Sequence, residues 1–500
     1  MKLKKVMAAG MAAVMTMGVL AGCGGTKKVE TNADGKEVVN LKWYQIGDAQ
    51  EDMEKVEQKI NEYTKDKIGV TIDITQISFG DYNSKMLVAT NTGEEFDLVY
   101  TCSWAHDFAQ NAQKGAFLAL NDLLKEEGKE MYESIDKKFW EAATIDGNIY
   151  AVPSQKEIGS MPMWVFTKEY VDKYDIPYED IHSLEDLEPY LQLIKEKEPD
   201  VVPLYLSKDF SAPAYMDLIQ KPIGIEYGDT TLTVKNLYET DKMMDTLRTM
   251  HKYYKAGYIN QDAATVTPDN IIKRFVSKGD GQPYAEKIWS KDLGYEVVAS
   301  PIMDTVVTNS SARGAMTAIS RTSKHPKEAM KFLNLVNTDE YLRNLLNYGI
   351  EGEHWEKVAV TDDEKKEFEG KDYIYDYKVK LNADTQKKYS VPYYVQGDMF
   401  KTYVLDTEPL DKWNTFKEFN DEAVAAPSFG FNFDITPVAT EVATFQNILN
   451  EFGAAINTGS VDPDVYVPKL LEKMKAAGSD KVIKEMQKQI DEWKANQKAE

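Results

Sequence analysis

The stretch from residue 39 to residue 101 constrains the fold most strongly, because strand and helix patterns alternate along it. Apolar residues alternate with polar ones over 39–43 and again over 70–74, the spacing of strands with one buried face. Between these segments, apolar residues recur at helical spacing over 53–63. The run FDLVY, residues 96–100, is nearly continuous in apolar side chains, as in a strand buried on both faces. The order strand, helix, strand, buried strand predicts an α/β fold with a largely parallel sheet.

The rest of the chain continues this mixed pattern as one intertwined unit. We find no internal repeat, low-complexity block or Pro/Gly linker after Glu37. A helix is expected to start at Pro326, because proline at a first-turn position loses no hydrogen bond. The other expected elements are strands within 147–153, 161–170 (leading into a helix), 293–301 and 312–320. Helices are expected over 181–195, over 237–254, from 338–340 to near Gly349, and along the C-terminal residues 482–493.

The N-terminus carries the pattern of an export signal. Three lysines precede the apolar run 6–20, which is followed by Ala21 and Gly22, the small residues that a signal peptidase needs. The run is too short to span a membrane, which takes about 20 residues. Leu20-Ala21-Gly22-Cys23 is similar to the bacterial lipoprotein box, whose cysteine sulfur receives a diacylglyceryl group. The alternative is an ordinary signal peptide with a chance cysteine.

A lipid on Cys23 would place the protein on the outer face of the cell membrane. The two acyl chains of a diacyl lipid are the number that stable anchoring requires. The residues that follow, 24–37, are small and polar and lack apolar periodicity, so they are expected to form a flexible tether. Fourteen such residues span roughly 20 Å as a coil. We therefore expect residues 1–22 to be a signal peptide and 23–37 a tether.

Composition excludes several kinds of partner and chemistry. The formal net charge of −23 disfavours nucleic acid and anionic lipid surfaces. Cys102 is the only cysteine besides Cys23, so no intramolecular disulfide is expected and stability must come from packing. No HExxH, G-x-S-x-G or cysteine–histidine signature is present, and the five histidines lack metal-ligand spacing. We expect no catalytic residues, no metal and no cofactor.

Several stretches, in the same order, resemble extracellular solute-binding proteins of the maltose-binding type, family 1. They are FDLVY followed by a loop, GNIYAVP, MPMWVFTKEYVDKYDIP, YEVVASP and AISRTSKHPKEAMKFLNLV. A closer resemblance is to the LipO-like lipoprotein subfamily, through LNYGIEGEHW, GFNFDITPV and TGSVDPDVYVPKLLEKMKAAG. The resemblance implies a two-lobed α/β fold, the type II periplasmic-binding-protein-like fold, with a hinge, a cleft and an extra helical C-terminal region.

The resemblance also implies a division of the chain and a role in transport. The first lobe would comprise 38–152 and 293–322, and the second 153–292 and 323–500, including the C-terminal region. A monomer would capture a sugar in the cleft, close over it and deliver it to the transmembrane permease of an ABC importer. The chain has no GxxxxGK[ST] phosphate loop, so the ATPase must be another polypeptide.

A sugar site needs flat aromatic walls and hydrogen-bonding side chains at its edge. In the family, a Gly-Pro-Trp turn often supplies a second-lobe ring, and Gln282-Pro283-Tyr284 is the nearest match here. For each ring, burial in the core is the alternative, and Arg313 could bind a carboxylate or pair with a surface acid. The candidate residues are Trp43, Tyr44, Asp48, Asp81, Tyr82, Trp104, Glu157, Trp164, Tyr284, Trp289 and Arg313.

Two other functions stay open at this point. A lipid-anchored polysaccharide hydrolase would need two carboxylates at a set separation, which 82 acidic residues can neither show nor exclude. A peptide-binding receptor on the same fold would pair with peptide backbone and need fewer rings in its cleft.

Overall fold

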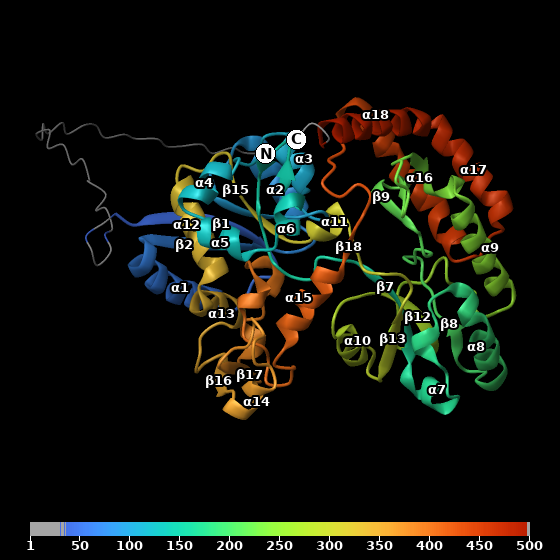
Figure 1. The fold of residues 1–500 in the computed structure, drawn as a ribbon, viewed down its shortest axis with the longest axis horizontal. Helices are drawn as coiled ribbons and strands as arrows, with labels where there is room; N and C mark the ends of the chain where they lie inside the picture. Colours follow the sequence, from blue (N-terminus) through green and yellow to red (C-terminus); the bar gives the residue numbers. More distant parts are fainter. Residues whose placement is uncertain (1–30, 32–34, 36, 498–500) are drawn as a thin grey trace, which may run out of the picture.

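Two large hydrophobic cores, each with its own β-structure, divide the described part of the chain into two lobes (Figure 1). The coordinates are a computed structural model, which describes Thr31, Gly35 and residues 37–497. Within this part, no helix combines the length and apolar character needed to cross a membrane. The expected signal peptide, Cys23 and most of the expected tether lie outside the described residues.

The first lobe surrounds a five-stranded sheet with strand order β2-β1-β3-β15-β6. β1 pairs in parallel with β2 and β3, whereas β15 is antiparallel to β3 and β6. Every residue of β3 is buried, so the FDLVY run forms the covered strand that its composition predicts. The strands are β1 (Val39–Ile46), β2 (Val70–Ile77), β3 (Leu98–Thr101), β6 (Val152–Pro153) and β15 (Met316–Ile319).

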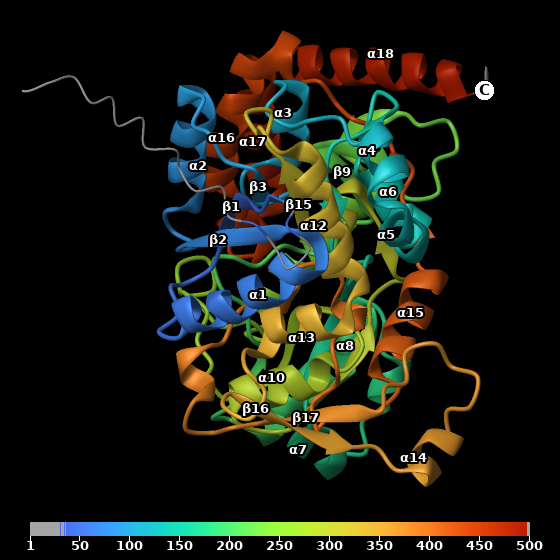
Figure 2. The same cartoon turned by 90° about the vertical axis from the view of Figure 1, so that its left-hand side faces the viewer.

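Helices α1 (Met53–Ile68) and α12 (Pro326–Thr338) contact each other and lie against this sheet (Figure 2). α1 ends at Gly69, whose left-handed backbone, with φ 70°, suits glycine. α12 begins at Pro326, as predicted. The other elements of this lobe are α2 (Tyr82–Thr92), α3 (Phe108–Gln113), α4 (Asn121–Glu126), α5 (Lys129–Ser134), α6 (Lys137–Ala142), β4 (Thr144–Ile145), β5 (Asn148–Ile149), α11 (Asn309–Ala312) and α13 (Glu340–Tyr348).

The second lobe holds a four-stranded sheet, β13-β7-β12-β8, and a three-stranded antiparallel sheet, β11-β10-β9. β7 is antiparallel to β12 and β13, so this sheet is not largely parallel as predicted; within it β8 and β12 are the parallel pair. The elements are β7 (Met161–Thr167), α7 (Lys168–Lys173), η1 (Tyr178–Asp180), α8 (Leu184–Lys197), β8 (Val202–Leu204), β9 (Met216–Gln220), β10 (Ile223–Glu226), β11 (Val234–Asn236), η2 (Leu237–Glu239), α9 (Asp241–Lys255), β12 (Arg274–Gly281), α10 (Ala285–Leu293) and β13 (Val297–Pro301).

The C-terminal region adds helices to the second lobe. Buried residues of these helices, among them Phe445, Leu470 and Met486, join the same core as the second-lobe sheet. The region therefore extends this lobe and is not a separate domain. Its elements are η6 (Thr436–Val438), α16 (Ala439–Asn457), α17 (Pro463–Ala476) and α18 (Ser479–Gln497).

Three chain segments cross between the lobes side by side. Ser160 and Val306 exchange backbone hydrogen bonds of 2.9 and 3.1 Å. β14 (Val306–Val307) pairs in parallel with β18 (Val424–Ala425). The first segment leads into β7 and the second follows β13, which explains why these two strands are antiparallel. The crossings form the connection about which the lobes can turn.

The lobes differ from the division expected from the sequence. Residues 326–348 were expected in the second lobe, yet Phe332 and Leu346 lie in the first core. β13 was expected in the first lobe, yet it pairs with β7 in the second. The physical reason is that the chain crosses after residue 301 and returns only at 423–426, so α12 and α13 stay on the side of β15.

Residues 349–422 form an insertion that packs against the first core through residues such as Tyr389 and Val395. It also has two small cores of its own, one around Phe400 and Trp413 and one around Trp355. Its elements are β16 (Trp355–Ala359), α14 (Asp362–Lys366), β17 (Tyr377–Leu381), η3 (Gln386–Lys388), η4 (Tyr393–Val395), η5 (Met399–Lys401) and α15 (Lys412–Glu422).

Candidate functional site

A cleft of about 730 Å³ lies between the lobes, a volume in the usual range for a small-ligand site. The first lobe contributes residues after β3 and around α11, and the second contributes β9 and the end of β12. The crossing segments and the start of the C-terminal region complete the wall. The lining residues fall within 103–113, 156–160, 216–227, 280–282, 308–314 and 428–435.

Trp104 is the exposed ring on the first-lobe side of the cleft. It follows the carboxyl end of β3, and 49% of its surface is exposed. Its Nε1 donates a 3.0 Å hydrogen bond to the Gly314 carbonyl, which fixes the ring. Phe79, 45% exposed, stacks beside it with centroids 6.3 Å apart and planes 16° from parallel. Phe79 does not line the cleft itself and supports the Trp104 ring from its side; the sequence predicted Trp104 and not Phe79.

Two half-buried rings of the second lobe also line the cleft, Tyr227 and Phe433. Burial raises the pKa of Tyr227 to about 12, so its hydroxyl stays protonated and can donate a hydrogen bond. Phe433 belongs to the C-terminal region. Sequence analysis missed both, although Phe433 lies in the GFNFDITPV motif that carried the resemblance.

Three of the four carboxylates that line the cleft, among the described residues, are held by neighbouring groups. Glu157, a predicted site residue, lines the cleft in an ion pair with Lys156. Asp107 accepts a 2.8 Å hydrogen bond from the Gln110 backbone and so caps α3. Burial raises the pKa of Asp107, and the nearby Arg313 opposes this rise. Since acids and bases nearly balance, the cleft favours a neutral ligand.

Arg313 lines the cleft as predicted, but its role differs from both expected ones. Its side chain is buried, and Nε donates a 2.7 Å hydrogen bond to the Ala142 carbonyl. Nη2 donates to the side-chain oxygen of Asn432 in the C-terminal region. Burial lowers the pKa of Arg313 to about 10, so it stays protonated at neutral pH. Arg313 therefore joins parts of the cleft wall.

Asp217 and Ser428 link β9 to the start of the C-terminal region. The Asp217 carboxylate accepts hydrogen bonds of 2.8 Å from the Ser428 backbone and 2.6 Å from its hydroxyl. Burial raises the pKa of Asp217, and the two bonds counter that rise. This carboxylate is thus engaged in holding the wall.

Three predicted rings lie in the cores and not in the cleft. Trp43 packs edge-on against Phe332 of α12 and is 1% exposed. Trp164 is fully buried in the central strand β7. Tyr82 is fully buried too, and its hydroxyl donates a 2.7 Å hydrogen bond to the Tyr100 carbonyl. These three side chains are therefore part of the hydrophobic cores, which was the alternative given for each predicted ring.

The remaining candidates lie at other surfaces. Tyr44 donates a 2.5 Å hydrogen bond to Glu94, Asp48 is exposed, and Asp81 accepts a 2.9 Å bond from Ser78. Tyr284 packs against the insertion, where its hydroxyl lies 3.0 Å from that of Thr415. Trp289 lies against the backbone of β12 at Gly279. None of these five lines the cleft.

Comparisons with known proteins now identify the family. Residues 47–342 match the family model of the bacterial extracellular solute-binding proteins. The chain belongs to this family. Residues 427–495 of this solute-binding protein match a second model, described only as a domain of unknown function, DUF3502.

The solute-binding protein also has relatives that match along nearly its whole length. It is 34% identical over 491 residues to a carbohydrate ABC transporter substrate-binding protein of Streptococcus pneumoniae serotype 4, covering 96% of both chains. It resembles the crystal structure of the N-glycan transport solute-binding protein NgtS of Streptococcus pneumoniae, with 33% identity and a TM-score of 0.81 over 92% of this chain and 100% of that one. NgtS in complex with Man5GlcNAc gives a TM-score of 0.68 over 92% of this chain and 99% of that one, at 34% identity. These likenesses confirm the predicted two-lobed α/β fold.

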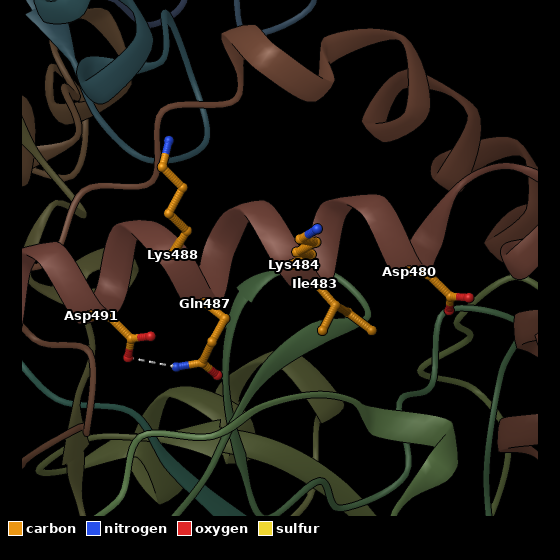
Figure 3. A pocket seen from close by; sticks show the side chains of 6 residues that line it. All are labelled: Asp480, Ile483, Lys484, Gln487, Lys488 and Asp491. Atoms are coloured by element: carbon orange, nitrogen blue, oxygen red, sulfur yellow. Dashed lines mark hydrogen bonds between the residues drawn. The ribbon is translucent and has the colours of Figure 1, made fainter.

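Other places in the solute-binding protein could also suggest a site, among them a hollow on α18 and a cluster of three possible metal ligands. A hollow of about 560 Å³ on α18 is lined by one helix alone, and its Gln487 donates a 3.0 Å hydrogen bond to Asp491 (Figure 3). Asp52, Glu353 and His354 also lie close enough for a metal ion. However, His354 Nδ1 accepts a 2.9 Å hydrogen bond from the Ile350 backbone, so the proton sits on Nε2, 3.1 Å from Asp52. That tautomer favours a hydrogen-bonded pair over a metal ligand.

Proposed function

We propose that this protein is the substrate-binding subunit of an ABC importer and that it binds a neutral oligosaccharide in the interlobe cleft. The observation that carries the proposal is the exposed Trp104–Phe79 stack at a cleft rich in amide and hydroxyl groups. Rings of this kind cover the C–H face of a sugar, while the amides and hydroxyls bond its rim. The names of the carbohydrate-binding relatives support the same ligand class.

The ligand would draw the lobes together and present them to the transmembrane permease subunits. The TM-score to NgtS is 0.81 for the crystal structure described without a glycan and 0.71 or 0.68 for the two glycan complexes. The lobes here are thus arranged more as in the former structure. Closure follows if the ligand contacts both lobes in the closed state and one in the open state.

We propose binding without chemical conversion. Asp107 caps a helix, Asp217 is bonded to Ser428, and Glu157 pairs with Lys156. A hydrolase needs one carboxyl group free to donate a proton and another free to act as base or nucleophile. These three carboxylates are engaged in holding the cleft instead. Asp280, exposed at the end of β12, is the one other carboxylate among the described residues that line the cleft, and a single free carboxylate does not supply the required pair.

The test is a melting-temperature screen of the purified chain with Man5GlcNAc, shorter neutral oligosaccharides, and di- and oligopeptides. A saccharide at 100 times its dissociation constant should stabilise the folded state by about 2.7 kcal/mol. Mass spectrometry should recover that saccharide unchanged. Stabilisation by peptides alone would favour a peptide receptor, and cleavage products would favour a hydrolase.

We also propose that Cys23 carries the lipid anchor. Cys23→Ser should move the protein from the membrane fraction to the medium, because the serine hydroxyl cannot form the thioether and the diacyl lipid is lost. Cys102→Ser is the control, since Cys102 is buried in the first lobe and should not affect anchoring. Fractionation followed by immunoblotting measures the distribution. If the Cys23 variant still sediments with membranes, the anchor lies elsewhere.

A further inference from the structure

The DUF3502 region starts at the cleft before its helices cover the second lobe. Residues 428–435, which we call the cleft loop, precede α16, α17 and α18. Five of them line the cleft, namely Ser428, Phe431, Asn432, Phe433 and Ile435. The region of unknown function is therefore part of the candidate site.

The first lobe holds the backbone of the cleft loop. The Asn309 side-chain nitrogen donates hydrogen bonds of 2.9 and 2.8 Å to the carbonyls of Ser428 and Phe431, and its oxygen accepts a 2.9 Å bond from the Gly430 backbone. Gly430 has a φ of 86°, which suits glycine. Arg313 holds the Asn432 side chain, which itself donates a 3.2 Å bond to the Thr144 carbonyl.

The second lobe fixes the same loop from its other side. Asp217 binds Ser428. The ring of the buried Phe431 packs against that of Trp493 of α18, with the ring centroids 5.7 Å apart. The Asp434 backbone donates a 2.9 Å hydrogen bond to Gln489, also on α18. Phe431 and Asn432 are held by these contacts. Phe433 packs partly against the second-lobe core and is the half-buried aromatic side chain of the loop that lines the cleft.

We propose that Phe433 is a sugar-stacking residue of the second lobe, so that the DUF3502 region takes part in ligand recognition. This inference rests on the proposed oligosaccharide function. Its support is that Tyr284 and Trp289, the rings expected for this role, lie outside the cleft, whereas Phe433 lines it together with Trp104. A ring on a backbone held by both lobes is preorganised, so it loses little entropy when it packs on a sugar.

Isothermal titration calorimetry with Man5GlcNAc, or with the saccharide that stabilises the chain most in the screen, tests this inference. Phe433→Ala should weaken binding roughly tenfold, since a stack contributes about 1 kcal/mol or slightly more. Phe433→Tyr should bind like the wild type, because it keeps a flat ring. Phe433→Leu keeps apolar bulk without the ring and should bind like the alanine variant.

Tyr466→Ala is the matched control. Tyr466 is a half-buried ring of α17 that packs against the same core but does not line the cleft. Its loss should leave affinity unchanged. Wild-type affinity in both Phe433→Ala and Phe433→Leu would overturn the inference and leave the proposed function intact. If Phe433→Ala does not fold, the leucine variant decides alone. A wild-type protein that binds no saccharide overturns both proposals.

Discussion

Trp104→Ala is expected to weaken binding of a stabilising oligosaccharide about a hundredfold. A central, rigid aromatic side chain typically contributes 2 kcal/mol or more to a binding site, and about 2.7 kcal/mol corresponds to a hundredfold change in Kd. Trp104 meets these conditions, because its Nε1 is bonded to Gly314 and its ring stacks on Phe79. Titration calorimetry measures the change, and Trp104→Phe should restore part of the affinity.

The matched control is Tyr341→Ala. Tyr341 lies on α13 of the same lobe, is 48% exposed and lies outside the cleft, so it reports the effect of removing an exposed ring elsewhere. Its affinity should equal that of the wild type. Since both rings are half exposed, both variants should keep their melting temperatures within a few degrees. Unchanged affinity in Trp104→Ala would exclude Trp104 from the site and remove the main support for a sugar ligand.

The sequence predicted that aromatic side chains would line the cleft, but of the rings it named only Trp104 is among the described lining residues. Trp43 and Trp104 both follow apolar strand residues, but Trp43 alternates with the buried Leu41, and this alternation already placed it on the core face. Trp104 comes after β3 has ended, where a side chain is free to face a ligand. Phe79 and Phe433 could not be placed, because their exposure depends on contacts between segments distant in sequence.

The boundaries of the lobes could not be predicted for the same reason: they depend on contacts between segments distant in sequence. The strands and helices that were predicted are present near their expected positions, since periodicity and capping are local signals, as at Pro326 and Gly69. No element was predicted within 196–236, 255–292 or 350–481, where the structure has several. The positions at which the chain crosses between the lobes are not determined by local sequence. β13 and β15 are both short apolar strands, yet one pairs with β7 and the other with β3. Only pairing across more than a hundred residues distinguishes them, so the sequence could not assign α12, α13 and the insertion.

Arg343→Met is expected to lower the free energy of unfolding by about 3–5 kcal/mol, because each buried acceptor left without a donor costs about 1–3 kcal/mol. Arg343 of α13 is fully buried and fastens the insertion to the first lobe. It donates hydrogen bonds of 2.9 Å to the Asp398 carbonyl, 2.6 Å to the Tyr393 carbonyl and 3.2 Å to the Asn347 side chain. Burial lowers its pKa to about 10, so the guanidinium is charged at neutral pH. Methionine fills much of the space but leaves all three acceptors without a donor.

Urea unfolding of Arg343→Met beside Arg248→Met separates a buried from an exposed arginine. Arg248 of α9 pairs with Asp245 and Asp464 at the surface, where its side chain is 51% exposed. Exposed ion pairs contribute at most about 1 kcal/mol, because water and salt screen them. The two variants delete the same charge, so a large loss confined to Arg343→Met measures the desolvated acceptors left behind. Equal, small losses would mean that water reaches those acceptors and that the insertion is held by its apolar contacts alone.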